Sequence, residues 1–191
     1  MIYETVITTV NKAEEVHIAP MGITRENGLI VITPFKPSTT LDNLQETKRA
    51  VINMIDDVSI IAGCLTGRRS WPLQQAKKVK GKVLQACLSH IEVEVDSVKD
   101  DELRPHFYCN EVYSATHAPF KGFNRAQAAV LEAAILVSRL HMLPREKINS
   151  ELAYLQIAID KTAGEKEHIA WQWLMKSVET YMQTQKKEAQ S

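Results

Sequence analysis

The sequence predicts an α+β fold, in which a small, closed or nearly closed antiparallel β-barrel precedes a set of helices. Strand-like segments rich in Val, Ile and Thr, with Gly and Pro between them, fill the first half of the 191 residues. One of them, residues 91–96 (IEVEVD), alternates as a strand with one buried face does. From residue 122 onward, apolar residues recur at helical spacing. Strands first and helices later are typical of the α+β class.

The expected strands follow one another with recognisable turns. Asn27 and Gly28 both tolerate positive φ, so they predict a hairpin between residues 19–24 and 29–33. The run 58–64 is short and apolar and fits a strand or a helix equally. The remaining expected elements are strands at 3–10, 16–21, 50–55, 84–98 and 107–115 and a short helix at 41–48.

The C-terminal part reads as three helices. Asn124 is a candidate N-cap for an Ala-rich helix over residues 126–140. Further helices are expected at 146–162 and 166–185, and residues 186–191 read as a frayed tail. We therefore expect a barrel domain over 1–120 and a helical region over 121–191, packed on the barrel or on a dimer partner.

Bulk properties exclude several classes of protein. Acidic and basic residues balance at 23 each, which argues against a nucleic-acid partner. No stretch approaches the roughly 18 apolar residues of a membrane span. The three cysteines lie far apart and outside any CxxC motif, so neither a disulfide nor a zinc site is expected, and a reducing cytoplasm is the simplest location.

The familiar catalytic and ligand motifs are absent. The sequence contains no GxGxxG, GxxxxGK[ST], GxSxG or HExxH pattern. The six histidines show no metal-ligand spacing, so no metal is expected. Glu92, Glu94 and Asp96 alternate along one strand and read as its solvated face. No catalytic residue can be named from these patterns.

Residues 34–44 (PFKPSTTLDNL) form the segment richest in chemical information. Two prolines end a strand, and three hydroxyl residues stand where the short helix begins. Hydroxyls and free N–H groups at a helix start, with Lys36 nearby, favour a phosphate-binding corner. Ordinary helix capping explains the same residues, and the segment alone does not decide between the two.

The first half resembles the flavin-reductase-like FMN-binding split barrel. Residues 17–23 (HIAPMGI) look like its ring-facing strand, residues 34–44 like its phosphate corner, and residues 50–54 like the strand that follows. More narrowly, the chain resembles an uncharacterised family of that superfamily, known from methanogenic archaea and from bacteria with methanopterin-linked one-carbon chemistry. The segment 123–126 (FNRA) before the Ala-rich helix belongs to this resemblance.

The resemblance implies an FMN-binding, homodimeric flavoprotein with the flavin near the subunit interface. It implies a redox enzyme acting on a small molecule, flavin-reductase-like and linked to methanopterin chemistry. Ala19 and Gly22 would admit close approach of the ring, and Lys36 or Arg125 would supply charge. The implied FMN-binding residues are His17, Ala19, Pro20, Met21, Gly22, Lys36, Ser38, Thr39, Thr40, Asn43 and Arg125.

Two other functions stay open at this point. The chain fits a non-catalytic protein that holds flavin as a carrier, sensor or assembly factor. It also fits a scaffold without flavin, whose last helix, residues 166–185, is an interaction surface.

Overall fold

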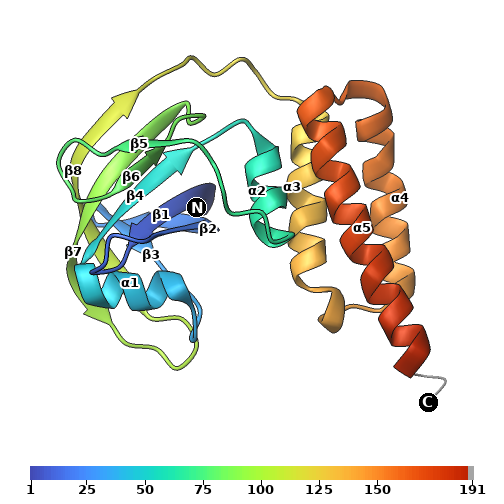
Figure 1. Ribbon diagram of the computed structural model, residues 1–191, viewed down its shortest axis with the longest axis horizontal. Coiled ribbons are helices and arrows are strands. Elements are labelled where there is room, and N and C mark those ends of the chain that lie inside the picture. The colour runs from blue at the N-terminus through green and yellow to red at the C-terminus, as the bar shows by residue number, and fades with distance from the viewer. Residues whose placement is uncertain (189–191) are drawn as a thin grey trace. The chain divides into compact units, whose positions relative to one another are not determined.

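The computed structural model describes residues 1–188 and divides the chain into two compact units. The first unit consists of Met1–Asp56 and Arg69–Phe120, and the second consists of Asp57–Arg68 and the residues from Lys121 onward. Figure 1 shows the strands of the first unit and the helices of the second.

The first unit is a closed antiparallel barrel with the strand order β1-β2-β3-β8-β7-β4. This confirms the predicted α+β class and the barrel. The barrel strands are β1 (Tyr3–Val10), β2 (Val16–Glu26), β3 (Leu29–Ile32), β4 (Arg49–Met54), β7 (Ser89–Lys99) and β8 (His106–Thr116).

The hairpin between β2 and β3 turns as its sequence predicts. Asn27 and Gly28 have φ of 50° and 83°, values that a β-branched residue rarely adopts. Inside the barrel, apolar residues from all six strands form one core, in which Phe107 and Ile52 are fully buried. One face of each strand therefore turns toward the barrel core.

The long strand expected over 84–98 is divided in the structure. A short hairpin of β5 (Leu73–Gln75) and β6 (Lys82–Leu84) precedes β7. The chain turns between β6 and β7, because the Cys87 N–H donates to the Leu84 carbonyl and the Leu88 N–H donates to Met54. The continuous apolar pattern hid this turn, which contains neither Gly nor Pro.

Helix α1 (Thr39–Thr47) belongs to the barrel unit and packs against β1 and β2. Leu41 and Leu44 on its inner face join the barrel core. The helix ends at Lys48, which is left-handed with φ of 57° and donates its N–H to the Leu44 carbonyl. Its start is two residues earlier than the predicted helix.

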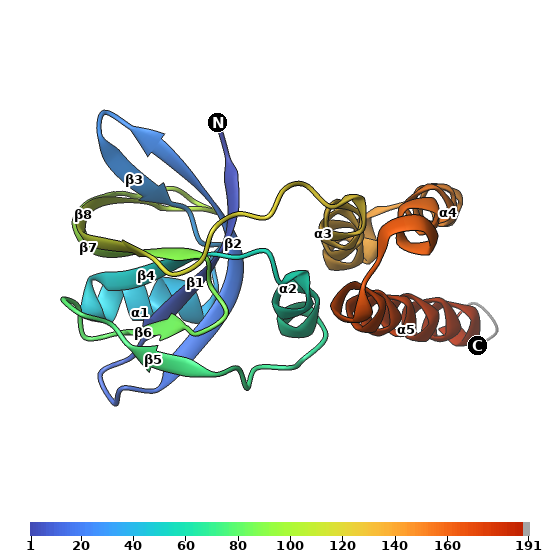
Figure 2. The ribbon, with the colours of Figure 1, turned by 90° about the horizontal axis from the view of Figure 1, so that it is seen from above.

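The second unit contains α2 (Val58–Leu65), α3 (Arg125–Ser138), the 3-10 turn Leu140–Met142, α4 (Arg145–Thr162) and α5 (Glu165–Glu188). The ambiguous run 58–64 is thus helical. Helix α3 packs against α2, α4 and α5, and its buried alanines allow that close approach. Figure 2 shows α3, α4 and α5 grouped together. Asn124 caps α3 as predicted, accepting from the N–H groups of Ala126 and Gln127.

Helix α5 continues through residues 186–188, where the tail was expected to fray. The rest of that predicted tail, residues 189–191, lies outside the described residues. None of the helices that the structure describes combines the length and the apolar character needed to cross a membrane. Within residues 1–188, the cysteines form no disulfide.

Candidate functional site

The start of α1 provides hydrogen-bond donors at one corner of the barrel unit. Ser38 is the N-cap, and its Oγ accepts from the Leu41 N–H at 3.2 Å. Its hydroxyl proton remains available for donation, because a hydroxyl accepts and donates at once. Thr39 is exposed in the first turn, whereas Thr40 is 2% exposed. The N–H groups of Thr39 and Thr40, which have no acceptor within the helix, and the hydroxyls of Ser38 and Thr39 can therefore meet an anion here.

Lys36 is engaged elsewhere in the structure. Its Nζ lies 2.6 Å from Asp100 Oδ1 and donates to the Asp101 carbonyl at 2.7 Å. A hydrogen bond from Lys36 is the main reason that the pKa of Asp100 lies below its ordinary value. The use of Lys36 as the cation of an anion site stays a prediction, and it requires the ammonium group to leave Asp100.

Strand β2, which α1 contacts, offers a backbone edge in the same unit. Val16 to Ile23 pair with β1, but the ladder between β2 and β3 begins only at Ile23. In an antiparallel ladder, each strand turns about half of its N–H and C=O groups toward each neighbour. The edge of residues 17–22 that faces away from β1 thus has no strand partner within residues 1–188. This edge can hydrogen-bond a planar, polar ligand.

The predicted ring-facing residues alternate along β2. Ala19 is paired with Ile7 and Met21 packs on the barrel core, so these two face inward with His17. Pro20 and Gly22 face the other way. A Cβ at Gly22 would lie 2.7 Å from Ile2 Cγ2, so the space beside this glycine holds a side chain of the same chain. Because Ala19 and Gly22 face opposite sides of β2, one ligand can contact both residues only along the backbone edge of the strand.

Asn43 and His17 connect α1 to β2 through β1. The Asn43 Nδ2 donates to Thr9 Oγ1 at 2.9 Å, and Thr9 is paired with His17. Burial, followed by the positive charge of Arg69, lowers the pKa of His17. Arg69 is exposed and was not among the predicted site residues. Arg69 is thus a cation of the barrel unit whose charge affects His17 on the predicted ring-facing strand.

Arg125 lies in the helical unit and is the first residue of α3. It is exposed and lines a cavity of about 250 Å³ together with Glu132 and Tyr154. The predicted site residues of α1 and β2 thus belong to the barrel unit, whereas Arg125 belongs to the helical unit. Its assignment to a flavin site stays a prediction.

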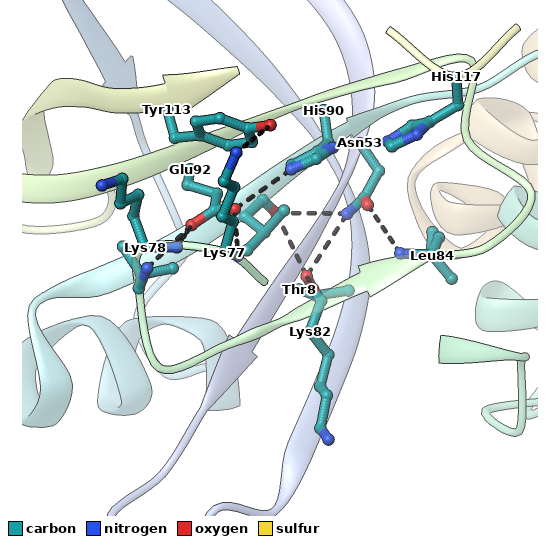
Figure 3. A network of polar contacts seen from close by, with 12 residues as sticks. Thr8, Asn53, Lys77, Lys78, Lys82, Leu84, His90, Glu92, Tyr113 and His117 are labelled. Carbon is teal, nitrogen blue, oxygen red and sulfur yellow. Dashed lines mark hydrogen bonds and ion pairs between the residues drawn. The ribbon is translucent and has the colours of Figure 1, made fainter. Parts of the chain in front are cut away.

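A buried polar network lies on the outer face of the barrel sheet, beneath the β5–β6 hairpin (Figure 3). Asn53, fully buried on β4, donates to the Val6 carbonyl at 3.0 Å and accepts from the Leu84 N–H at 2.9 Å. Thr8 donates to the Lys82 carbonyl. These contacts replace the ladder that the hairpin does not share with the barrel, so the hairpin is held by side chains.

Glu92 is at the centre of that network, and its reading as a solvated residue is wrong. It is 0% exposed, and its carboxylate accepts from the N–H groups of Lys77, Lys78 and Val79 at 2.6–2.8 Å. Burial alone raises the pKa of Glu92, but these three donors and His90 outweigh it, and the pKa lies below its ordinary value. Glu94 is exposed as predicted.

The His90 ring joins Glu92 to a second histidine. His90 Nε2 lies 3.3 Å from Glu92 Oε1, and His90 Nδ1 lies 2.8 Å from His117 Nε2. His90 is 4% exposed, and His117 is exposed. Sequence spacing gave no signal for this cluster, since the two histidines lie 27 residues apart. The only local hint is that His90 and Glu92, two residues apart, share one strand face.

The comparisons with known proteins identify the family. The profile of DUF447, described as a protein of unknown function, matches residues 3–118 with its N-terminal domain and residues 124–176 with a second part. The chain belongs to the DUF447 family. No curated protein sequence matches it.

Several solved structures resemble this DUF447 chain in fold. One is the FMN-bound protein MM1853 from Methanosarcina mazei, itself a DUF447 protein, with a TM-score of 0.80 at 19% identity over 92% of this chain and 94% of that chain. The flavin reductase of styrene monooxygenase from Pseudomonas putida S12 has a TM-score of 0.51 at 14% identity, covering 61% of this chain and 80% of that one.

A flavoredoxin from Methanosarcina acetivorans is similar at a TM-score of 0.54 and 12% identity, over 61% of this chain and 69% of that chain. These likenesses confirm the predicted flavin-reductase-like barrel. Together with the family, they also confirm the resemblance stated from the sequence.

Proposed function

We propose that this DUF447 chain is an FMN-binding flavoprotein with a redox role. The observation that carries the proposal is the pairing, within one unit, of a helix-start anion corner with the unpartnered edge of β2. The fold relative from Methanosarcina mazei, described as FMN-bound, supports the choice of FMN.

The donor set of the barrel fits the two ends of FMN. A phosphate dianion binds best to converging N–H and hydroxyl donors, which the α1 start and the hydroxyls of Ser38 and Thr39 provide. The backbone edge of residues 17–22 would hold the polar ring. Arg69 would supply positive charge from the same unit. Bound FMN would supply hydride or electron transfer, and this chain's residues would hold and orient it.

The remaining predicted residues belong to the proposal with smaller roles. Asn43 would fix the helix against β1 through Thr9, and Met21 would keep the strand seated on the core. Pro20 keeps its own backbone from donating a hydrogen bond at the edge. The buried Thr40 would hold the first turn in place. His17, Ala19, Gly22, Lys36 and Arg125 stay candidate contacts.

The proposal keeps the domain bounds, the homodimer, the location and the substrate class that were expected from the sequence. The FMN domain would be residues 1–120 and the helical region 121–191, although the compact helical unit also takes in α2. A homodimer with flavin near its interface, a cytoplasmic location, and a small-molecule substrate from methanopterin chemistry stay predictions. Neither the fold nor the relatives named above bear on the pterin.

The first test is the absorption spectrum of the untagged, purified protein, followed by release and identification of any chromophore. Released FMN supports the proposal. A colourless protein that takes up neither FMN nor FAD at micromolar concentration refutes it and leaves the barrel as a scaffold.

Turnover then separates an enzyme from a carrier. Steady oxidation of NADH or NADPH by the FMN-loaded protein supports a reductase. If the FMN-loaded protein oxidises none of several electron donors, the alternative is favoured, a non-catalytic flavin-binding or assembly protein.

The position of the phosphate is tested by substitution at the corner. Thr39→Val keeps the side-chain shape and removes an exposed hydroxyl. A hydrogen bond to a charged group contributes about 1.5–3 kcal/mol, so FMN affinity should fall by about tenfold or more.

The matched control is Thr47→Val in the last turn of the same helix, where the hydroxyl bonds only the Asn43 carbonyl. Equal FMN affinities for the two variants would show that the phosphate does not bind at this corner.

A further inference from the structure

Three potential metal ligands meet at one end of the barrel unit. The ligand atoms of Cys87, His90 and His117 all lie within 4.8 Å of one another. Cys87 stands in the turn before β7, His90 is the second residue of that strand, and His117 follows β8 directly. The turn is fixed, because the N–H groups of His117 and Ala118 both donate to the Leu88 carbonyl, at 2.7 and 3.1 Å.

Glu92 determines which nitrogen of His90 is available. Its carboxylate accepts three backbone N–H bonds and has only acceptor capacity left for His90. His90 Nε2, which lies 3.3 Å from Glu92 Oε1, must therefore carry the proton and donate it to that oxygen. A neutral His90 then presents its Nδ1 lone pair toward His117 and Cys87. A carboxylate that orients a histidine in this way is a recurrent outer partner of metal-binding histidines.

We propose that Cys87, His90 and His117 bind one divalent transition-metal ion of the zinc class. A thiolate sulfur with two imidazole nitrogens is a donor set suited to zinc, and hard cations such as magnesium prefer oxygen. Three protein ligands leave one tetrahedral position for water or another small ligand. The site is distinct from the α1 corner and does not depend on the proposed flavin.

The geometry requires one of the two histidine rings to turn. His90 Nδ1 and His117 Nε2 are 2.8 Å apart, as in a hydrogen bond, and the rings are stacked with planes 6° apart. Two nitrogens at about 2.0–2.1 Å from one tetrahedral zinc lie roughly 3.3 Å apart, so the pair must open by about half an ångström. The two ring nitrogens now face each other, so one ring must also turn until both lone pairs point at the ion. His117 is exposed, so its ring can move and the ion has a route in from solvent.

The competing explanation is that the two histidines only share a hydrogen bond. In that case His117 contributes to local packing, and removing it changes no metal affinity. Zinc titration separates the two explanations, because only the metal site needs all three side chains.

The experiment uses the untagged, full-length protein, stripped of metal with a chelator that is then removed. Zn²⁺ is titrated by calorimetry, and X-ray absorption at the zinc edge counts the ligands, a readout that a bound flavin does not mask. We expect one equivalent of zinc with one sulfur ligand and nitrogen or oxygen for the rest. His117→Ala, at an exposed position, should weaken binding by at least about tenfold.

Two further variants make the result specific. Cys87→Ser should remove the sulfur signal, and His141→Ala, which changes an exposed histidine of the helical unit, should leave the affinity unchanged. Absence of stoichiometric zinc, a zinc spectrum without sulfur, or equal affinities for His117→Ala and His141→Ala would overturn the proposal. FMN content, measured on the same samples, reports separately on the proposed function.

Discussion

Replacing Glu92 by Gln tests whether the buried carboxylate holds the β5–β6 hairpin to the barrel. The change keeps the size of the side chain and replaces one acceptor oxygen by an NH₂ group. Glu92 Oε1 accepts from Lys77 and faces His90, and Oε2 accepts from both Lys78 and Val79. In either orientation, the new NH₂ group meets a backbone donor.

The orientation of the introduced amide that loses fewer hydrogen bonds determines the expected loss of stability. Oxygen would stay opposite Lys78 and Val79, and NH₂ would face the Lys77 N–H, while His90 changes tautomer to accept from it. One buried donor is then unsatisfied, at about 1–3 kcal/mol, and the two bonds that remain lose their charge-assisted strength. We expect a loss of about 3 kcal/mol in the free energy of unfolding. For a chain of this size, that lowers Tm by about 6–12 °C.

Urea denaturation at several pH values is the assay. The pKa of Glu92 is lowered in the folded protein, so the ionised group stabilises the fold above its unfolded pKa, and this contribution is lost as pH falls through the folded pKa. The stability of Glu92→Gln should therefore depend less on pH in the acid range. Glu94→Gln, at an exposed position of the same strand, is the control. Equal stabilities and equal acid dependence for the two variants would refute the reasoning.

Three smaller predictions concern residues with defined local roles. Asn53→Leu removes the acceptor of the Leu84 N–H and a donor to the Val6 carbonyl, so urea denaturation should show a loss of about 2–4 kcal/mol. Asn124→Ala removes the cap of α3 and should cost about 1 kcal/mol in the same assay, with Asn124→Asp restoring most of it; a silent Ala variant would contradict the capping role. Gly28→Ala places a side chain at φ of 83° and should lower stability by about 1–2 kcal/mol, and an unchanged Tm would count against a strained turn.

The fold was predictable where local chemistry and global structure agree. The Asn27–Gly28 turn, the Asn124 cap and the strand character of residues 91–96 are local signals, and the structure contains the turn, the cap and the strand β7. The run at 58–64 was ambiguous because apolar residues alone suit both a strand and a helix, and its packing against α3 and α5 decided it.

The polar network was not predictable, for a different physical reason. Alternation shows that Glu92 and Ile91 face opposite sides of β7, and it assigns the polar side to water. It cannot show that a loop from residues 77–79 covers that polar side and supplies backbone donors. In the same way, Lys36 near a hydroxyl cluster suggested an anionic ligand, but its ammonium group pairs with Asp100 of the β7–β8 loop, 64 positions away.

The way in which Glu92 is bound also constrains how this chain can diverge. Its three partners are backbone N–H groups, so the side chains at residues 77–79 are not needed for the contact. Almost any amino acid can replace the two lysines, with proline excluded because it lacks the N–H. Among homologues, we therefore expect the acidic residue on the strand to persist while the loop it organises varies in sequence and keeps its length.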